Sequence, residues 1–155
     1  MPRFQTKLIA RAGVLVASVA AMALSGCGSE PVDPNAVATV PVALHVTLDG
    51  RPIEDATVIF HPVDQSSTGE NRLTPRGLVQ PDGSVVVTTY RRGDGLPPGE
   101  YQLAFSWQGP LDGLDEDEID ELKERMPRAY TRPATSGQLI AVLADEQNEF
   151  APIEL

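Results

Sequence analysis

The sequence predicts an all-β domain, and three observations carry this prediction. Apolar and polar residues alternate in several short runs, as from Val42 to Leu48, so that every second side chain would cover one face of a strand. Turn signals containing Gly and Pro separate these runs at short intervals. The 155 residues, 41% of them apolar, suffice for one domain and are few for two. We therefore expect a seven-stranded antiparallel β-sandwich over residues 41–155, with one short acidic helix on a crossover.

Seven segments carry the strand pattern. In chain order they are residues 42–48, 56–61, 72–80, 85–90, 101–107, 138–143 and 150–155. Asp49-Gly50-Arg51-Pro52 follows the first segment and predicts a turn before the second segment, because glycine tolerates the positive φ of a tight reversal. Pro75 and Gly77 interrupt the third segment, which favours an edge strand or a bulge. The polar residues 145–148 predict a turn between the last two strands.

An aromatic stripe lies in the fifth segment, at Tyr101, Leu103, Phe105 and Trp107. Four large side chains at a period of two cover one face of a strand. We expect them to fill the sandwich core, with Trp107, at the strand end, the most exposed of the four. The alternative is a platform on which sugar rings stack.

Residues 111–126 break the β pattern and predict a helix. Ile119, Leu122 and Met126 have helical spacing, acidic residues come first, and basic residues follow, which complements a helix dipole. The acidic residues are Asp112, Asp115, Glu116, Asp117, Glu118, Asp120, Glu121 and Glu124. A calcium loop starting at Asp115 would need an oxygen ligand where Ile119 stands and glycine where Asp120 stands. A solvated helix is therefore expected rather than a calcium site built on Asp115, Asp117 and Asp120.

Charge and cysteine content exclude several function classes. The chain has 12 Lys and Arg against 22 Asp and Glu, a formal net charge of -10. Such a surface repels phosphate backbones, so we expect no nucleic-acid partner. The chain's single cysteine rules out an internal disulfide and a cysteine-rich zinc site.

The first 26 residues have the layout of a secretory signal peptide. Their only charges are Arg3, Lys7 and Arg11, and an apolar run follows over residues 12–24. A membrane-spanning helix needs about 20 apolar residues, and this run is shorter. We expect residues 1–26 to be a helical export signal.

The end of this segment, Leu24-Ser25-Gly26-Cys27, resembles the lipobox of bacterial lipoproteins. The resemblance implies cleavage between Gly26 and Cys27, a diacylglyceryl thioether on Cys27 and acylation of its new amino group. The alternative is a lone buried cysteine. Several acyl chains hold a protein firmly to a bilayer without spanning it. Gly28, the residue after the cysteine, makes this position similar to that of lipoproteins that are exported beyond the inner membrane.

Residues 27–40 are expected to be the lipidated cysteine and a flexible tether. Residues 28–40 contain two prolines and show no periodicity. If extended, they would hold the domain about 40 Å from the bilayer. A strand that starts early, near Ala36, would shorten this reach.

Three sequence blocks together resemble the carboxypeptidase regulatory-like, or transthyretin-like, domain found in small bacterial lipoproteins. They are Leu48-Asp49-Gly50-Arg51-Pro52 with Asp55-Ala56-Thr57-Val58, then Leu96-Pro97-Pro98-Gly99-Glu100-Tyr101, then Pro127-Arg128-Ala129-Tyr130-Thr131 with Thr135-Ser136-Gly137. The resemblance covers residues 41–155 and implies a seven-stranded prealbumin-like (Ig-like) sandwich without catalysis. It also places Tyr101 like the aromatic residue that secures a sandwich corner.

Enzyme and metal functions find little support in the sequence. A transthyretin-like hydrolase would need a Tyr-Arg-Gly-Ser end, whereas residues 150–155 read Phe-Ala-Pro-Ile-Glu-Leu. His45 and His61 are expected on outward faces, close together on adjoining strands. Two imidazoles fall short of the three or four ligands of a zinc site, so we expect neither metal nor cofactor.

The sequence thus predicts an exported lipoprotein, attached by lipid to the outer membrane or to the periplasmic face of the inner membrane. Its sandwich is expected to be a non-catalytic interaction or structural module of the cell envelope, with an envelope protein or a carbohydrate as partner. The alternative is an envelope binder of a carbohydrate or divalent cation. Loss of residues 1–26 would leave 9 Lys and Arg against 22 Asp and Glu, or -13.

Overall fold

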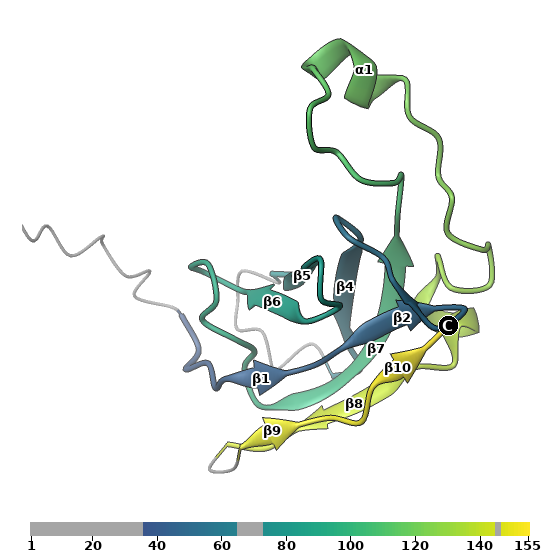
Figure 1. Ribbon diagram of the computed structural model, residues 1–155. Coiled ribbons are helices and arrows are strands. Elements are labelled where there is room, and N and C mark those ends of the chain that lie inside the picture. Colours follow the sequence, from purple (N-terminus) through teal and green to yellow (C-terminus); the bar gives the residue numbers. More distant parts are fainter. Residues whose placement is uncertain (1–35, 65–72, 145–146) are drawn as a thin grey trace, which may run out of the picture. The chain divides into compact units, whose positions relative to one another are not determined.

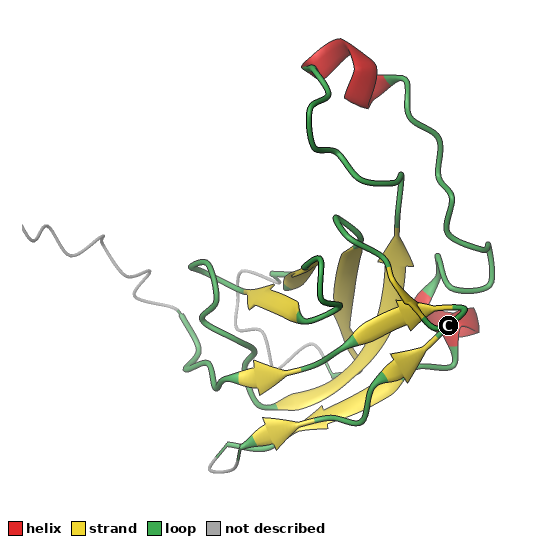
Figure 2. Ribbon diagram, in the orientation of Figure 1, coloured by secondary structure: helices red, strands yellow, loops and turns green. Residues whose placement is uncertain are grey.

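The computed structural model describes residues 36–64, 73–144 and 147–155. Strands dominate these residues, and the helices among them are two short ones (Figure 2). The predicted all-β class is therefore confirmed. The predicted signal peptide, the lipobox with Gly26 and Cys27, and most of the tether lie outside the described residues.

The strands lie within or beside the predicted segments. They are β1 (Val42–Ala43), β2 (Val46–Leu48), β3 (Arg51–Pro52), β4 (Thr57–Pro62), β5 (Arg76–Val79), β6 (Val85–Thr88), β7 (Gly99–Ser106), β8 (Leu139–Val142), β9 (Asn148–Glu149) and β10 (Ile153–Glu154). The Asp49-Gly50 turn joins β2 to β3 as an antiparallel hairpin, with φ of 51° and 73° at the two residues. The reversal lies where it was predicted, but Arg51 and Pro52, expected in the turn, form β3, and β4, the next predicted strand, belongs to a different sheet.

A five-stranded antiparallel sheet with the order β6-β5-β4-β7-β8 forms the larger layer (Figure 1). In its central pair, Val58 is opposite Phe105, and Phe60 is opposite Leu103. These four side chains are at most 1% exposed, because they share the face that packs into the core. The alternate side chains of the same strands form the outer face of the sheet.

The second layer corrects the prediction of a wholly antiparallel sandwich. The strand pairs β1–β9 and β2–β10 are parallel, whereas β2–β3 is antiparallel. The chain leaves the five-stranded sheet after β8 and crosses to the other layer, where it runs in the same direction as β1 and β2. Of the predicted turn over residues 145–148, Asn148 already belongs to β9, and residues 145 and 146 lie outside the described residues. Periodicity identifies a strand but does not name its partner.

Backbone hydrogen bonds join the two layers along one side. Val85 N–H donates to Leu44 O at 3.0 Å, and Val46 N–H donates to Gly83 O at 2.9 Å. Farther along, Val40 and Leu96 form an antiparallel bridge. The start of β6 is thereby linked to the segment that contains β1 and β2, so that the sheets curl into a half-barrel.

The core lies between the layers and confirms the predicted apolar faces. Leu44 and Val46 enter it from the first segment, at 1% and 0% exposure. Of the predicted aromatic stripe, Tyr101, Leu103 and Phe105 are fully buried, and Trp107 is partly buried against the cluster. Core packing, rather than a sugar platform, is thus the role of the first three side chains.

The helices differ from the prediction. The helix expected over residues 111–126 is only α1 (Glu116–Asp120), which begins with a capping box between Asp115 and Glu118. It is short because its acidic neighbours at i, i+4 repel each other, and because none of its side chains is buried. A second helix, α2 (Pro133–Ser136), was not predicted, although proline at its first position and glycine after its end, Gly137 with φ of 70°, are ordinary helix boundaries. Within the described ranges, neither helix is long and apolar enough to cross a membrane.

Candidate functional site: an arginine-flanked trough on the outer sheet face

The two histidines do not form a common site. His45 lies just before β2 and is bridged to Ser84, whereas His61 lies in β4 opposite Gln102. The expectation that they stand on adjoining strands is wrong, because β4 and β2 belong to different sheets. Burial lowers the pKa of His61, which favours its neutral form. No group of three metal-binding side chains occurs among the described residues.

The acidic segment forms an arm, defined here as residues 107–126, that leaves the end of β7 and projects from the sheet (Figure 1). Hydrogen bonds fix its base to the turn before β4. Trp107 Nε1 donates to Glu54 O at 2.9 Å, and Leu111 N–H donates to Asp55 Oδ2 at 2.9 Å. The partial burial of Trp107 thus serves to anchor the arm, whereas Asp115, Asp117 and Asp120, which were expected to be solvated rather than to bind calcium, are exposed on it.

Glu124 closes the base of the acidic arm. Its Oε1 accepts hydrogen bonds from the backbone N–H groups of Trp107 and Met126, both at 2.8 Å, and its Oε2 accepts from the Ser106 hydroxyl at 2.6 Å. Burial alone would raise the pKa of Glu124, but these donors outweigh it and lower the pKa below its usual value. Glu124 therefore has a structural role, which sequence inspection did not distinguish from that of the other acids.

Tyr101 likewise has a structural role. Its hydroxyl donates to Pro97 O at 2.8 Å, four residues upstream, and its side chain is fully buried. The ring meets that of Phe60 edge to face, with the centroids 6.3 Å apart. The bond holds the start of β7 to the segment just before it.

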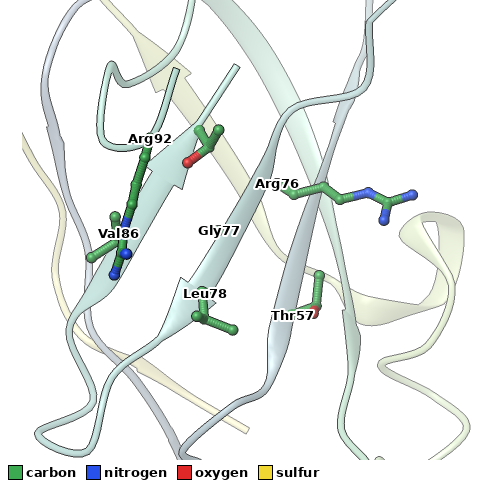
Figure 3. Close-up of a pocket in the computed structure, with 7 residues that line it drawn as sticks. Thr57, Arg76, Gly77, Leu78, Val86 and Arg92 are labelled. Atoms are coloured by element: carbon green, nitrogen blue, oxygen red, sulfur yellow. The ribbon is translucent and has the colours of Figure 1, made fainter. Parts of the chain in front are cut away.

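A trough of about 370 Å³ lies on the outer face of the five-stranded sheet (Figure 3). We call it the arginine trough. The side chains that line it come from β4, β5, β6 and the loop after β6, and they are Thr57, Arg76, Leu78, Val86, Thr88 and Arg92. Strand register explains the grouping, since Leu78 is paired with both Thr57 and Val86, and Arg76 is paired with Thr88. All of these strand residues alternate with core residues and so face outward.

Gly77 gives the trough its backbone floor. A Cβ at this position would lie 2.3 Å from Val85 Cγ1 and 3.3 Å from Phe60 Cε2, on the core side of the sheet. The missing side chain lets β5 lie close to the core at the centre of the trough. The predicted interruption at Gly77 is thus a site of tight packing, and β5 is an inner strand between β4 and β6 rather than an edge strand.

The trough is cationic in an acidic protein. Strands β4, β5 and β6 carry no Asp or Glu, and their one Lys or Arg is Arg76. Figure 3 shows Arg92 beside Val86 and Arg76 on the side of Thr57, so the two guanidinium groups flank an apolar centre. Sequence reasoning did not single out either arginine. The signal was available, because residues 73–93 hold three arginines and one acid in a chain whose acids outnumber its bases.

What the trough can do chemically follows from these groups. Guanidinium forks bind carboxylates and phosphates in a bidentate manner, and threonine hydroxyls donate or accept single hydrogen bonds. These groups suit the arginine trough to bind an anion. Comparison with protein-family models, with curated proteins and with solved structures finds no match for this chain.

Proposed function

We propose that the protein is a lipid-anchored lipoprotein of the bacterial cell envelope, whose β domain is a non-catalytic interaction or structural module. The observation that carries the proposal is the sequence Leu24-Ser25-Gly26-Cys27 after a basic start and a 13-residue apolar run over residues 12–24. The thiol of Cys27 would be alkylated with a diacylglyceryl group, and cleavage before it would make Cys27 the first residue. Two or three acyl chains would then hold the protein on the outer membrane or on the periplasmic face of the inner membrane.

The domain is proposed to be a prealbumin-like sandwich of the carboxypeptidase regulatory-like kind. Two features support this. Each of the seven predicted segments contains a strand. The tyrosine that opens the fifth segment donates its hydroxyl to a backbone carbonyl four residues upstream, the arrangement that secures corners in sandwich folds.

The separation of His45 and His61 on different sheets supports a role other than hydrolysis. A hydrolase of the transthyretin-like kind would gather its histidines and an arginine in one pocket. The arginine trough contains neither histidine. The module is therefore proposed to act by binding an envelope partner or by supporting a neighbouring protein.

The anchor is tested by expressing the full chain in a bacterium supplied with a labelled fatty acid. The wild type should carry the acyl label and lose residues 1–26. Cys27→Ala should stay unlabelled and keep these residues, because alkylation of the thiol precedes cleavage. Ser29→Ala is the matched control, since it lies outside the lipobox and should behave as the wild type. Label retained by Cys27→Ala, or a wild type that takes up no label, would refute the anchor.

Membrane fractionation complements the labelling. An uncleaved Cys27→Ala chain keeps its apolar segment over residues 12–24 and can remain in the membrane fraction for that reason alone. The acyl label and the mass of the amino-terminal peptide are therefore the deciding measurements.

A second candidate function, an envelope protein that binds a soluble ligand, is favoured by one observation, the arginine trough. Its volume of about 370 Å³ is at the lower end of the range for small-molecule sites. The lining has two cations and two hydroxyl groups around an apolar centre. A binder and a scaffold differ in whether this trough takes a ligand.

A further inference from the structure

Neither Arg76 nor Arg92 has a carboxylate partner within the described residues. This is unusual for a chain with 22 acidic side chains and 12 basic ones. An exposed arginine gains little from a surface ion pair, so an unpaired one costs little when the site is empty. Both guanidinium groups are thus available to an incoming anion.

Two described acids near the arginines in sequence, Asp82 and Asp94, are occupied by other donors. The carboxylate of Asp94 accepts hydrogen bonds from the backbone N–H groups of Thr89, Tyr90 and Arg91, at 2.7 to 3.0 Å. Asp82 Oδ1 accepts both the N–H and the hydroxyl of Ser84, at 2.9 and 2.6 Å. These bonds fix the two carboxylates within their own turns.

The centre of the arginine trough is apolar. Leu78 is 41% exposed there, a large value for a leucine in an inner strand, and Val86 stands next to it on β6. The hydroxyls of Thr57 and Thr88 lie along the trough. The side chains that line the trough include no aromatic ring, so they offer no stacking surface for a sugar. The lining instead fits an apolar chain segment between two anionic ends.

We propose that the arginine trough binds a small ligand with two oxyanion groups, carboxylates or phosphates, joined by a short apolar spacer. One anionic end would meet Arg92 beside Val86, and the other would meet Arg76 on the side of Thr57. The spacer would cover Leu78 and remove its exposed surface from water. The site goes beyond the proposed anchor and does not depend on it, because the arginine trough is built from residues of the β domain.

The protein's overall charge limits the affinity to a moderate value. A net charge of -10 repels an anion at long range. At 0.15 M salt the Debye length is about 8 Å, so contact with the two guanidinium groups outweighs the distant acids. We therefore expect binding in the millimolar range, weakened by added salt.

The test uses the whole chain as the bacterium produces it, solubilised in detergent micelles, with arginine side chains labelled with ¹⁵N for NMR titration. Adipate provides two carboxylates and a four-carbon spacer, and 1,4-butanediol bisphosphate provides two phosphates on a spacer of the same length. Hexanoate has one carboxylate, and inorganic phosphate has no spacer. Adipate or the bisphosphate should bind about tenfold more tightly than hexanoate and inorganic phosphate, because each can form charge-assisted hydrogen bonds with both guanidinium groups.

Variants locate the site. Arg76→Gln and Arg92→Gln should each weaken binding of the tighter of the two ligands, adipate or the bisphosphate, about three- to tenfold. Arg76→Lys should retain part of the wild-type affinity, because lysine keeps the charge but cannot bind an oxyanion with two parallel N–H groups. Arg51→Gln is the matched control on β3 of the other sheet and should bind as the wild type. Circular dichroism of each variant checks that these exposed substitutions leave the fold intact.

Three outcomes would overturn the proposal. One is the absence of a chemical-shift change at both Arg76 and Arg92 during titration with adipate and with the bisphosphate. Another is an equal loss in Arg51→Gln, which would mean non-specific charge attraction. The third is equal affinity for inorganic phosphate, for adipate and for the bisphosphate, which would leave no role for the apolar centre. Because the acyl label of Cys27 is measured separately, failure of this site and failure of the anchor are distinguishable.

Discussion

Gly95→Ala tests how the segment before β1 is held to the domain. Gly95 has φ of 84°, and a Cβ built on it would lie 1.9 Å from the carbonyl oxygen of Val40 and 2.7 Å from its carbonyl carbon. These are backbone atoms, so no side-chain rotation can relieve the clash. The same Val40 forms a bridge with Leu96 through two hydrogen bonds, of 2.8 and 3.1 Å. An alanine therefore has to push the two backbones apart and break this bridge.

The expected magnitude combines two effects. Placing a side chain at positive φ costs roughly 1–2 kcal/mol. Loss of two backbone hydrogen bonds adds about 0.5–1.5 kcal/mol each. We expect Gly95→Ala to lower the free energy of unfolding by about 2–5 kcal/mol, which is a large share of the roughly 5–15 kcal/mol of a typical domain.

Gly93→Ala is the matched control in the same loop. Gly93 has φ of 76°, but its Cβ would meet only Val86 Cγ1, at 3.9 Å, so the conformational cost alone remains. Urea unfolding of both variants gives the two free energies. Amide hydrogen exchange at Leu96, whose N–H donates to Val40 O, should accelerate in Gly95→Ala and not in Gly93→Ala. Equal destabilisation of the two variants would refute the clash with Val40 and the expected loss of the Val40–Leu96 bridge.

Three further predictions concern the core and the base of the acidic arm. Tyr101→Phe should cost about 1–2 kcal/mol in urea unfolding, because the Pro97 carbonyl loses a buried donor; no change in stability would contradict the corner role. Gly77→Ala should cost about 1–3 kcal/mol by overpacking, since its Cβ would lie 2.3 Å from Val85 Cγ1, and a neutral result would show that the core yields freely there. Glu124 has a lowered pKa in the folded protein, so its contribution to stability is complete above its usual value of 4.5 and is lost as the pH falls through the lower folded value. The Glu124→Gln variant should therefore be less stable than the wild type in thermal unfolding at neutral pH, and its stability should depend less on pH below 4.5. Parallel curves of stability against pH for the two proteins would exclude this role.

Local signals in the sequence identify most of the strands and the faces they bury. The alternation at Leu44 and Val46 and the stripe at Tyr101, Leu103 and Phe105 correspond to the core that the structure contains. Such patterns succeed because burying apolar surface is the main favourable contribution to folding, and a strand can present only every second residue to one face. The Asp49-Gly50 hairpin is local for the same kind of reason, since two adjacent residues set its backbone.

Segments whose structure depends on a partner were predicted less well. The acidic sequence has helical spacing, but at Ile119 and Leu122 the side chains stay only partly buried, and the helix ends after five residues. His45 and His61 have similar outward positions in the pattern, yet they belong to different sheets. Pairing of strands depends on which segments meet in space, and alternation along one segment does not encode it.

By itself, the sequence determined the all-β class, the strand segments, the core residues and the excess of acids. The tertiary structure decided that β1 and β2 pair in parallel with β9 and β10, that Glu124 binds the base of its arm, and that Arg76 and Arg92 flank one trough. The physical reason is distance along the chain. Periodicity, turns and caps act between residues a few positions apart, whereas the trough joins residues from β4 to the loop after β6 that only sheet register brings together.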